Sequence, residues 1–204
     1  MDSVDEEKLA RRAARLRRRK AVVDAAIARA DEERGVVIVI TGNGKGKTTS
    51  AFGTLFRALG HGQRVGLVQF IKGTTTSGEI AFLEQCGGDV RYHAMATGFT
   101  WETRDWEADR RAAATAWTHA HEMLRDERLD LVVLDELTYM LKYRFLDAAE
   151  VAAAITARPR TQSVVATGRA APPALLEIAD TISEIREVRH AFHAGVKARA
   201  GIDF

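Results

Sequence analysis

Short apolar runs alternate with amphipathic stretches along most of this chain. Residues 36–40 (V-V-I-V-I) form a β-branched run, which is typical of a strand buried on both faces. Apolar runs at 64–70, 90–95, 129–134, 162–167 and 181–188 predict further strands. The segments between them predict helices at 48–59, 78–85, 107–126, 147–156 and 172–179, with a shorter helical stretch through Tyr139 and Leu141. This alternation predicts an α/β fold with a mostly parallel sheet and helices on both faces.

The first predicted strand is preceded by a charged segment that reads as a helix over residues 5–33. Its residues 8–20 hold eight Lys and Arg and no acid. Such a helix could contact nucleic acid, an anionic membrane or an anionic ligand, although a solvated helix is the simpler interpretation. Its apolar residues are mostly Ala, which disfavours membrane insertion. We therefore divide the chain into a basic N-terminal helical arm (1–34) and an α/β domain (35–204).

The composition of the chain is typical of a globular protein rather than a membrane or secreted one. Apolar residues make up 46% and charged residues 28% of the chain, as in a soluble globular protein, and the net charge of +2 does not indicate a nucleic-acid binder. No apolar run approaches the roughly 20 residues that cross a bilayer, and the charged N-terminus does not resemble a secretory signal. Cys86 is the only cysteine and can form no internal disulfide. These features predict a cytoplasmic protein.

A glycine-rich turn lies between the first predicted strand and the helix after it. Glycines at three alternate positions let successive backbone N–H groups point inward at phosphates, and the helix N-terminus adds partial positive charge. Lys47 would reach phosphate oxygens, and Thr48 would offer its hydroxyl to Mg²⁺. The first glycine stands one residue later than in the usual phosphate-binding pattern, so the loop is a variant. The predicted ATP-binding residues are Gly42, Asn43, Gly44, Lys45, Gly46, Lys47, Thr48 and Thr49.

Two further segments carry candidate chemistry. The strand predicted at 129–134 ends in Asp135 and Glu136, which would emerge where such folds bind ligands. Asp135 or Glu136 could complete a Mg²⁺ site with Thr48. Alternatively, one of these acids caps the following helix. Residues 96–106 place three aromatic side chains in a predicted loop, where they either fold onto the core or stack on a flat ligand.

With these elements placed, the chain resembles the bacterial corrinoid adenosyltransferases over nearly its whole length. The resemblance rests on T-G-N-G-K-G-K-T-T-S-A-F-G-T at 41–54, G-H-G-Q-R-V-G-L-V-Q-F-I-K-G at 60–73, M-A-T-G-F-T-W-E-T at 95–103, V-V-L-D-E-L-T-Y-M at 132–140 and H-A-F-H-A-G-V-K-A-R-A-G-I-D-F at 190–204. Two positions depart from it: His193 stands where Asp is common, and Phe204 where Tyr is usual.

The resemblance implies a RecA-like P-loop fold and transfer of the 5′-deoxyadenosyl group of ATP to the cobalt of a reduced corrinoid, with release of triphosphate. It implies Lys47, Thr48 and Glu136 as catalytic residues, and Mg²⁺ or Mn²⁺ held by Thr48, Asp135 and Glu136. It places Phe99, Trp101, Arg34 and Arg57 at the corrinoid. It further implies a homodimer whose N-terminal helix closes over the corrinoid, an electron-donating reductase such as a flavoprotein, and no nucleic-acid or membrane partner.

Two other functions fit parts of the sequence. A P-loop NTPase acting on nucleic acid would use the basic arm and would release free phosphate from ATP. A non-catalytic carrier would bind ATP and corrinoid without forming a cobalt–carbon bond. The anion released from ATP distinguishes the first alternative from adenosyl transfer, and the absence of an alkylcobalt product would mark the second.

Overall fold

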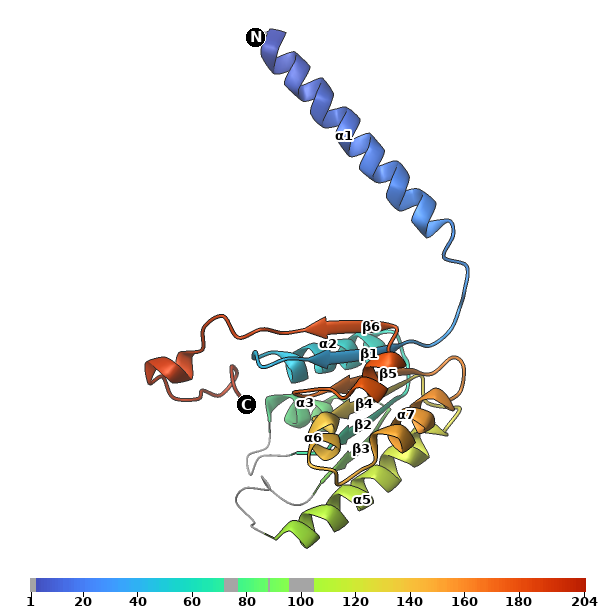
Figure 1. Ribbon diagram of the computed structural model, residues 1–204, viewed down its shortest axis with the longest axis vertical. Coiled ribbons are helices and arrows are strands. Elements are labelled where there is room, and N and C mark those ends of the chain that lie inside the picture. The colour runs from blue at the N-terminus through green and yellow to red at the C-terminus, as the bar shows by residue number, and fades with distance from the viewer. Residues whose placement is uncertain (1–2, 72–76, 88, 96–104) are drawn as a thin grey trace. The chain divides into compact units, whose positions relative to one another are not determined.

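The computed structural model describes residues 3–71, 77–87, 89–95 and 105–204. Its backbone divides into two units, Met1–Glu33 and Arg34–Phe204. The first unit holds α1 (Ser3–Ile27), and the second holds the sheet and the other helices drawn in Figure 1. No helix within the described residues is both long and apolar enough to span a membrane.

The second unit is built on a parallel six-stranded sheet, counted over the described residues, in the order β3-β2-β4-β5-β1-β6. Parallel pairing joins every neighbour, and β2 and β4 are buried along their whole length. The strands are β1 (Val37–Thr41), β2 (Val65–Gln69), β3 (Val90–Ala94), β4 (Leu131–Asp135), β5 (Ser163–Thr167) and β6 (Thr181–Glu184). The predicted α/β fold with a parallel sheet is confirmed.

Helices cover both faces of this sheet, and each face has its own apolar core (Figure 1). On one face lie α2 (Lys47–Gly60) and α3 (Gly78–Cys86), which bury Phe52, Leu55 and Ile80. On the other face lie α5 (Trp106–Leu124), α6 (Leu137–Lys142), α7 (Ala148–Thr156) and α8 (Pro173–Glu177). Because strand side chains alternate between faces, both cores draw on the same strands: Val132 and Leu134 serve one, Leu131 and Val133 the other.

Asp side chains fix where two of these helices begin. Asp105 accepts a hydrogen bond from the Ala108 N–H at the start of α5. Asp147 accepts from the N–H groups of Ala149 and Glu150 at the start of α7. Each carboxylate satisfies backbone donors that have no partner inside the helix and lies at its positive end.

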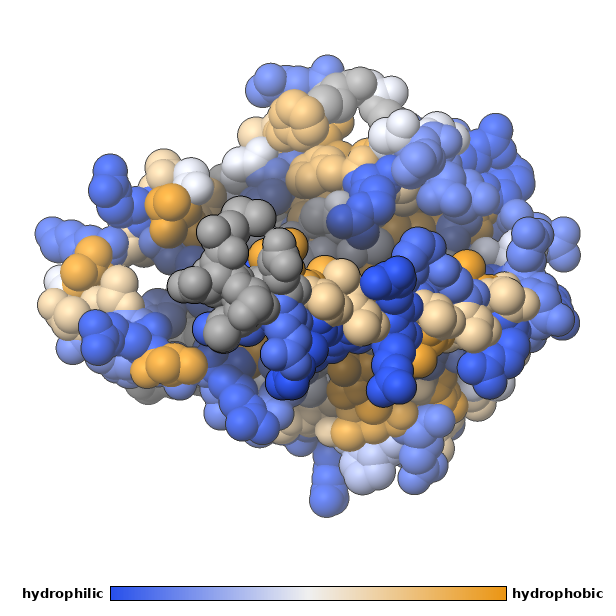
Figure 2. Space-filling view, turned by 90° about the horizontal axis from the view of Figure 1, so that it is seen from above, coloured by the Kyte–Doolittle hydropathy of each residue, from blue (hydrophilic) through white to orange (hydrophobic). Residues whose placement is uncertain are grey.

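The predicted bounds of two elements were wrong. The first helix ends at Ile27 rather than residue 33. A helix that continued to residue 33 would place Asp31, Glu32 and Glu33 at its C-terminal end, where the helix dipole disfavours negative charge. The last strand ends at Glu184 rather than residue 188, because its partner β1 ends at Thr41; Ile185 bonds Thr41 and then Gly44 of the glycine-rich loop. Hydrophilic residues predominate on the face of the molecule seen in Figure 2, and apolar residues form separate small groups there.

Candidate nucleotide-binding site

The glycine-rich loop follows β1 and leads directly into α2. Its glycines make close approaches that a side chain would prevent. A Cβ on Gly42, whose φ is 101°, would overlap the carbonyl of Ile185, and one on Gly44 would lie 2.7 Å from the carbonyl of Arg186. The Gly44 N–H donates to the Ile185 carbonyl at 2.8 Å. Residues 185–186, just beyond β6, therefore support the loop from behind, and only glycine fits at both contacts.

Lys47 begins α2 and folds back across the loop. Its Nζ donates to the carbonyl of Gly44 at 2.8 Å, and the residue is only 6% exposed. Burial lowers the pKa of Lys47, and the negative charge of Glu136 raises it in part. The ammonium group is thus held inside the loop, where it can meet an anion without a large side-chain rearrangement.

Thr48 and Asp135 are brought together by the fold although 87 residues separate them. The Thr48 hydroxyl donates to Asp135 Oδ1 at 3.0 Å, and the Thr167 hydroxyl donates to the same oxygen at 2.7 Å. The Gln69 amide donates to Asp135 Oδ2 at 3.3 Å. Burial raises the pKa of Asp135, and the hydrogen bonds from Thr167, Gln69 and Thr48 act in the opposite direction.

Glu136 follows Asp135 in the left-handed backbone region, with a φ of 58°. Its N–H donates to the Thr167 hydroxyl at 2.9 Å, which helps to hold this conformation. Its side chain makes no capping bond to α6, and so the capping alternative is not realised by Glu136. Within the described residues, Glu136 Oε2 is buried without a hydrogen-bond partner. Burial, reinforced by Asp135, raises the pKa of Glu136 to about 7.

A cavity of about 590 Å³ opens above the loop. Asn43 to Thr49 line it together with Gln69, Glu79, Glu136 and Arg169, and part of its wall comes from the C-terminal tail, which we define as residues 185–204. The tail contributes Glu187, His190, Gly201, Ile202, Asp203 and Phe204. The cavity volume falls within the range of small-molecule sites, and Lys45, Lys47 and Arg169 are among the residues that line it.

The tail is tied to the loop by an ion pair. Lys45 Nζ lies 2.9 Å from Asp203 Oδ1, and the two side chains are 44% and 27% exposed. Hydrogen bonding to Lys45 lowers the pKa of Asp203. The two departures from the family pattern also lie in the tail: His193 contacts Glu187 at 2.9 Å, and Phe204 lines the cavity.

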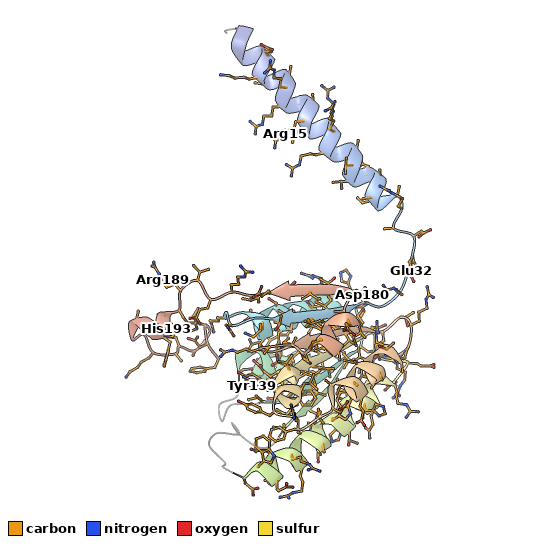
Figure 3. The ribbon with its side chains drawn as sticks, viewed as in Figure 1. Arg15, Glu32, Tyr139, Asp180, Arg189 and His193 are labelled. Atoms are coloured by element: carbon orange, nitrogen blue, oxygen red, sulfur yellow. The ribbon has the colours of Figure 1, made fainter. Side chains whose placement is uncertain are left out.

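The structure does not bring every predicted residue to this cavity. Arg34 forms a two-pronged ion pair with Asp180, with distances of 2.5 and 3.0 Å. Figure 3 shows Asp180 at the end of β6 away from the tail residues Arg189 and His193. Arg57 is exposed in the last turn of α2, roughly 15 Å along the helix from Lys47 at about 1.5 Å per residue. Phe99 and Trp101 lie outside the described residues.

Arg169 was not among the predicted site residues. It follows Gly168 at the carboxyl end of β5 and lines the cavity, where its charge acts on Lys47, Glu136 and Tyr139. Gly168 has a φ of 136°, and a Cβ there would overlap the Thr138 hydroxyl, so the turn that presents Arg169 requires glycine. A polar T-G-R sequence ending an apolar strand is the signal that could have identified this residue.

One family of known proteins matches this chain over most of its length. The family model described as "ATP:corrinoid adenosyltransferase BtuR/CobO/CobP" matches residues 33–204. The corrinoid adenosyltransferase CobA of Salmonella typhimurium is 58% identical over 182 residues, covering 89% of this chain and 92% of that protein. A corrinoid adenosyltransferase of Escherichia coli K12 is 55% identical over 93% of this chain and 96% of its own length. A corrinoid adenosyltransferase of Pseudomonas aeruginosa is 52% identical over 97% of this chain and 98% of its own length.

Proposed function

The chain belongs to the ATP:corrinoid adenosyltransferase family BtuR/CobO/CobP, and we propose that it performs this transfer in the cavity above its glycine-rich loop. It transfers the 5′-deoxyadenosyl group of ATP to the cobalt of a reduced corrinoid. Cobalt(I) supplies the electron pair that forms the bond to C5′. The bond between C5′ and the α-phosphate oxygen breaks, and triphosphate leaves with that electron pair.

We assign triphosphate binding to the loop from Gly42 to Thr49. The observation that carries this assignment is the cavity itself, which residues Asn43 to Thr49 line and in which the ammonium of Lys47 is held against the loop. Arg169 and Lys45 add positive charge at its wall. Since the leaving group is the entire triphosphate rather than one phosphoryl group, these cations stabilise charge that develops on the departing anion.

The residues beside the loop suit Mg²⁺ or Mn²⁺. Two carboxylates and a hydroxyl, from Asp135, Glu136 and Thr48, are the hard oxygen donors that such ions take beside a polyphosphate. Glu136 Oε2 is buried and unpartnered within the described residues, as a ligand atom would be without its ion. We propose that these three residues hold the metal, which would neutralise part of the triphosphate charge when bound. Asp135 then orients Thr48, and Glu136 supplies a second carboxylate.

We propose that Phe99 and Trp101 contact the corrinoid and displace its lower axial ligand, so that Co(II) can be reduced. Arg34 and Arg57 lie away from the cavity above the loop, and we propose that they contact a corrinoid bound at the other protomer of a homodimer. The apolar residues of α1 support such an assembly. Leu9, Leu16 and Val23 recur every seven residues on one side of the helix and are 73%, 57% and 55% exposed.

We propose that a separate reductase, such as a flavoprotein, supplies the electron, and that the enzyme acts in the cytoplasm in cobalamin synthesis and corrinoid salvage. The assay that tests the proposed function mixes the protein with ATP, Mg²⁺ and chemically reduced corrinoid. A light-sensitive alkylcobalt spectrum together with triphosphate is expected. Release of orthophosphate without that spectrum would instead indicate the NTPase alternative, and binding of both substrates without product would indicate a carrier.

A further inference from the structure

The carboxyl ends of three neighbouring strands carry polar side chains on one face of the sheet. Gln69 ends β2, Asp135 ends β4 and Thr167 ends β5, and Gln69 stands directly opposite Asp135 in the β2–β4 register. Two positions earlier, the same strands place Leu67, Val133 and Val165 in the core beneath α2. Because strand side chains repeat every two residues, all three polar groups point toward the start of α2, where Thr48 lies.

These groups form one buried chain of hydrogen bonds. Asp135 Oδ1 accepts from the hydroxyls of Thr48 and Thr167, which leaves Oδ2 to the amide of Gln69. On its other side, Gln69 Oε1 accepts from the hydroxyl of Tyr92 on β3 at 2.9 Å. Gln69 is 7% and Asp135 is 2% exposed. Water therefore has little access to the bonds that Gln69 and Thr167 donate to Asp135, whereas the bonds of Thr48 and Tyr92 are partly buried.

The Asp135 carboxylate, which can only accept, fixes which way the Gln69 amide faces, and the Tyr92 hydroxyl contacts the other end of the amide. A glutamine amide has one end that donates and one that accepts, and a flipped amide would set its carbonyl oxygen against the Asp135 carboxylate. With Tyr92 donating to Oε1, the NH₂ group is directed at Asp135 Oδ2. The carboxylate is thereby held at both oxygens, and its rotation away from Thr48 is restricted.

We propose that Gln69, supported by the hydrogen bond from Tyr92, is a positioning residue that holds Asp135 against Thr48 so that the loop binds ATP together with its metal ion. The inference rests on the metal assignment made under the proposed function. Outer hydrogen-bond partners of ligand carboxylates act in this way, and their loss typically weakens metal binding by roughly 10- to 100-fold. A glutamine that only offset the burial of Asp135 would affect stability but would not distinguish metal-bound from metal-free nucleotide.

The test is calorimetric titration of the full-length chain with ATP, once with Mg²⁺ and once with a chelator. The variants are Gln69→Met, which keeps the length of the side chain, and Tyr92→Phe, which removes one hydroxyl. Tyr143→Phe is the matched control, because Tyr143 packs on the other face of the sheet. We expect Gln69→Met to weaken MgATP binding by about tenfold or more. Tyr92→Phe should weaken it less, and both variants should bind metal-free ATP almost as wild type does.

Equal weakening of both titrations, or no weakening of MgATP binding, would overturn the positioning role. Thermal unfolding of each variant is measured alongside, and if Gln69→Met is unfolded at the assay temperature, Tyr92→Phe decides the question. Adenosyl transfer by the wild type is followed separately. If the wild-type protein binds MgATP but forms no alkylcobalt product, the proposed function is refuted. The titrations would still decide the role of Gln69.

Discussion

Glu136 has a carboxylate whose charge destabilises the folded protein. Burial raises its pKa from an ordinary 4.5 to about 7, and its Oε2 has no hydrogen-bond partner within the described residues. Between those two values the folded state holds a proton that the unfolded state has released. Stability therefore falls as the pH rises through this window, and the full loss is reached above about pH 7. At about 1.4 kcal/mol for each pH unit, the charge costs about 3 kcal/mol.

Glu136→Gln keeps the shape of the side chain and removes its charge. Without divalent metal, we expect the variant to be up to about 3 kcal/mol more stable than wild type at pH 8, or roughly 6–12 °C in unfolding temperature. The gain should shrink markedly at pH 5, where wild-type Glu136 is largely protonated. Thermal unfolding in the presence of a chelator at both pH values measures the effect, and Glu177→Gln, at an exposed position on α8, is the control.

The same substitution should lower adenosyl transfer, because the variant loses a proposed metal ligand. Stability would rise as activity falls, which is the trade-off expected where a site keeps a costly group for its chemistry. Added Mg²⁺ should narrow the stability difference, since only the wild type has the carboxylate to bind it. A variant that is no more stable at pH 8, or that gains equally at pH 5 and pH 8, would refute the reasoning.

Three further outcomes are expected. Lys47→Ala should abolish turnover and weaken ATP binding roughly 10- to 100-fold, through loss of charged hydrogen bonds to the triphosphate. ATP binding is measured by calorimetry, and an unchanged affinity would contradict this role of Lys47. Asp203→Asn frees Lys45 from a partly exposed ion pair and should tighten ATP binding by up to about fivefold. Weaker binding would show that Asp203 assists the nucleotide instead. Phe99→Ala should spare transfer to prereduced Co(I) more than transfer that starts from Co(II). Spectroscopic rates that fall equally in both assays would exclude that role of the aromatic loop.

The fold could be predicted from local patterns because its strands are buried runs of apolar residues between helices. The run at 36–40 and the glycine turn after it give both β1 and the start of α2. Element ends were less predictable where tertiary contacts decide them. The last strand stops at Glu184 because Glu184 pairs with Thr41, the last residue of β1, and the chain of β1 continues as the glycine-rich loop.

Only those parts of the site that lie within one short segment of the sequence could be predicted. The loop from Gly42 to Thr49 and the pair Asp135–Glu136 are each visible in a few consecutive residues. Gln69, Tyr92 and Thr167 come from separate strands, and their meeting depends on the order β3-β2-β4-β5. Hydrophobic periodicity indicates which residues form strands, but it does not indicate which strands lie side by side.

The protease sensitivity of the C-terminal tail should report whether a ligand occupies the cavity. Trypsin cleaves after Lys and Arg, and the tail exposes Arg186, Arg189, Lys197 and Arg199 close to residues that line the cavity. Nucleotide that packs against this wall should slow digestion there, while cleavage in the arginine-rich first unit continues as an internal standard. Limited digestion followed by mass spectrometry would thus rank nucleotides and metals without a label or a mutation.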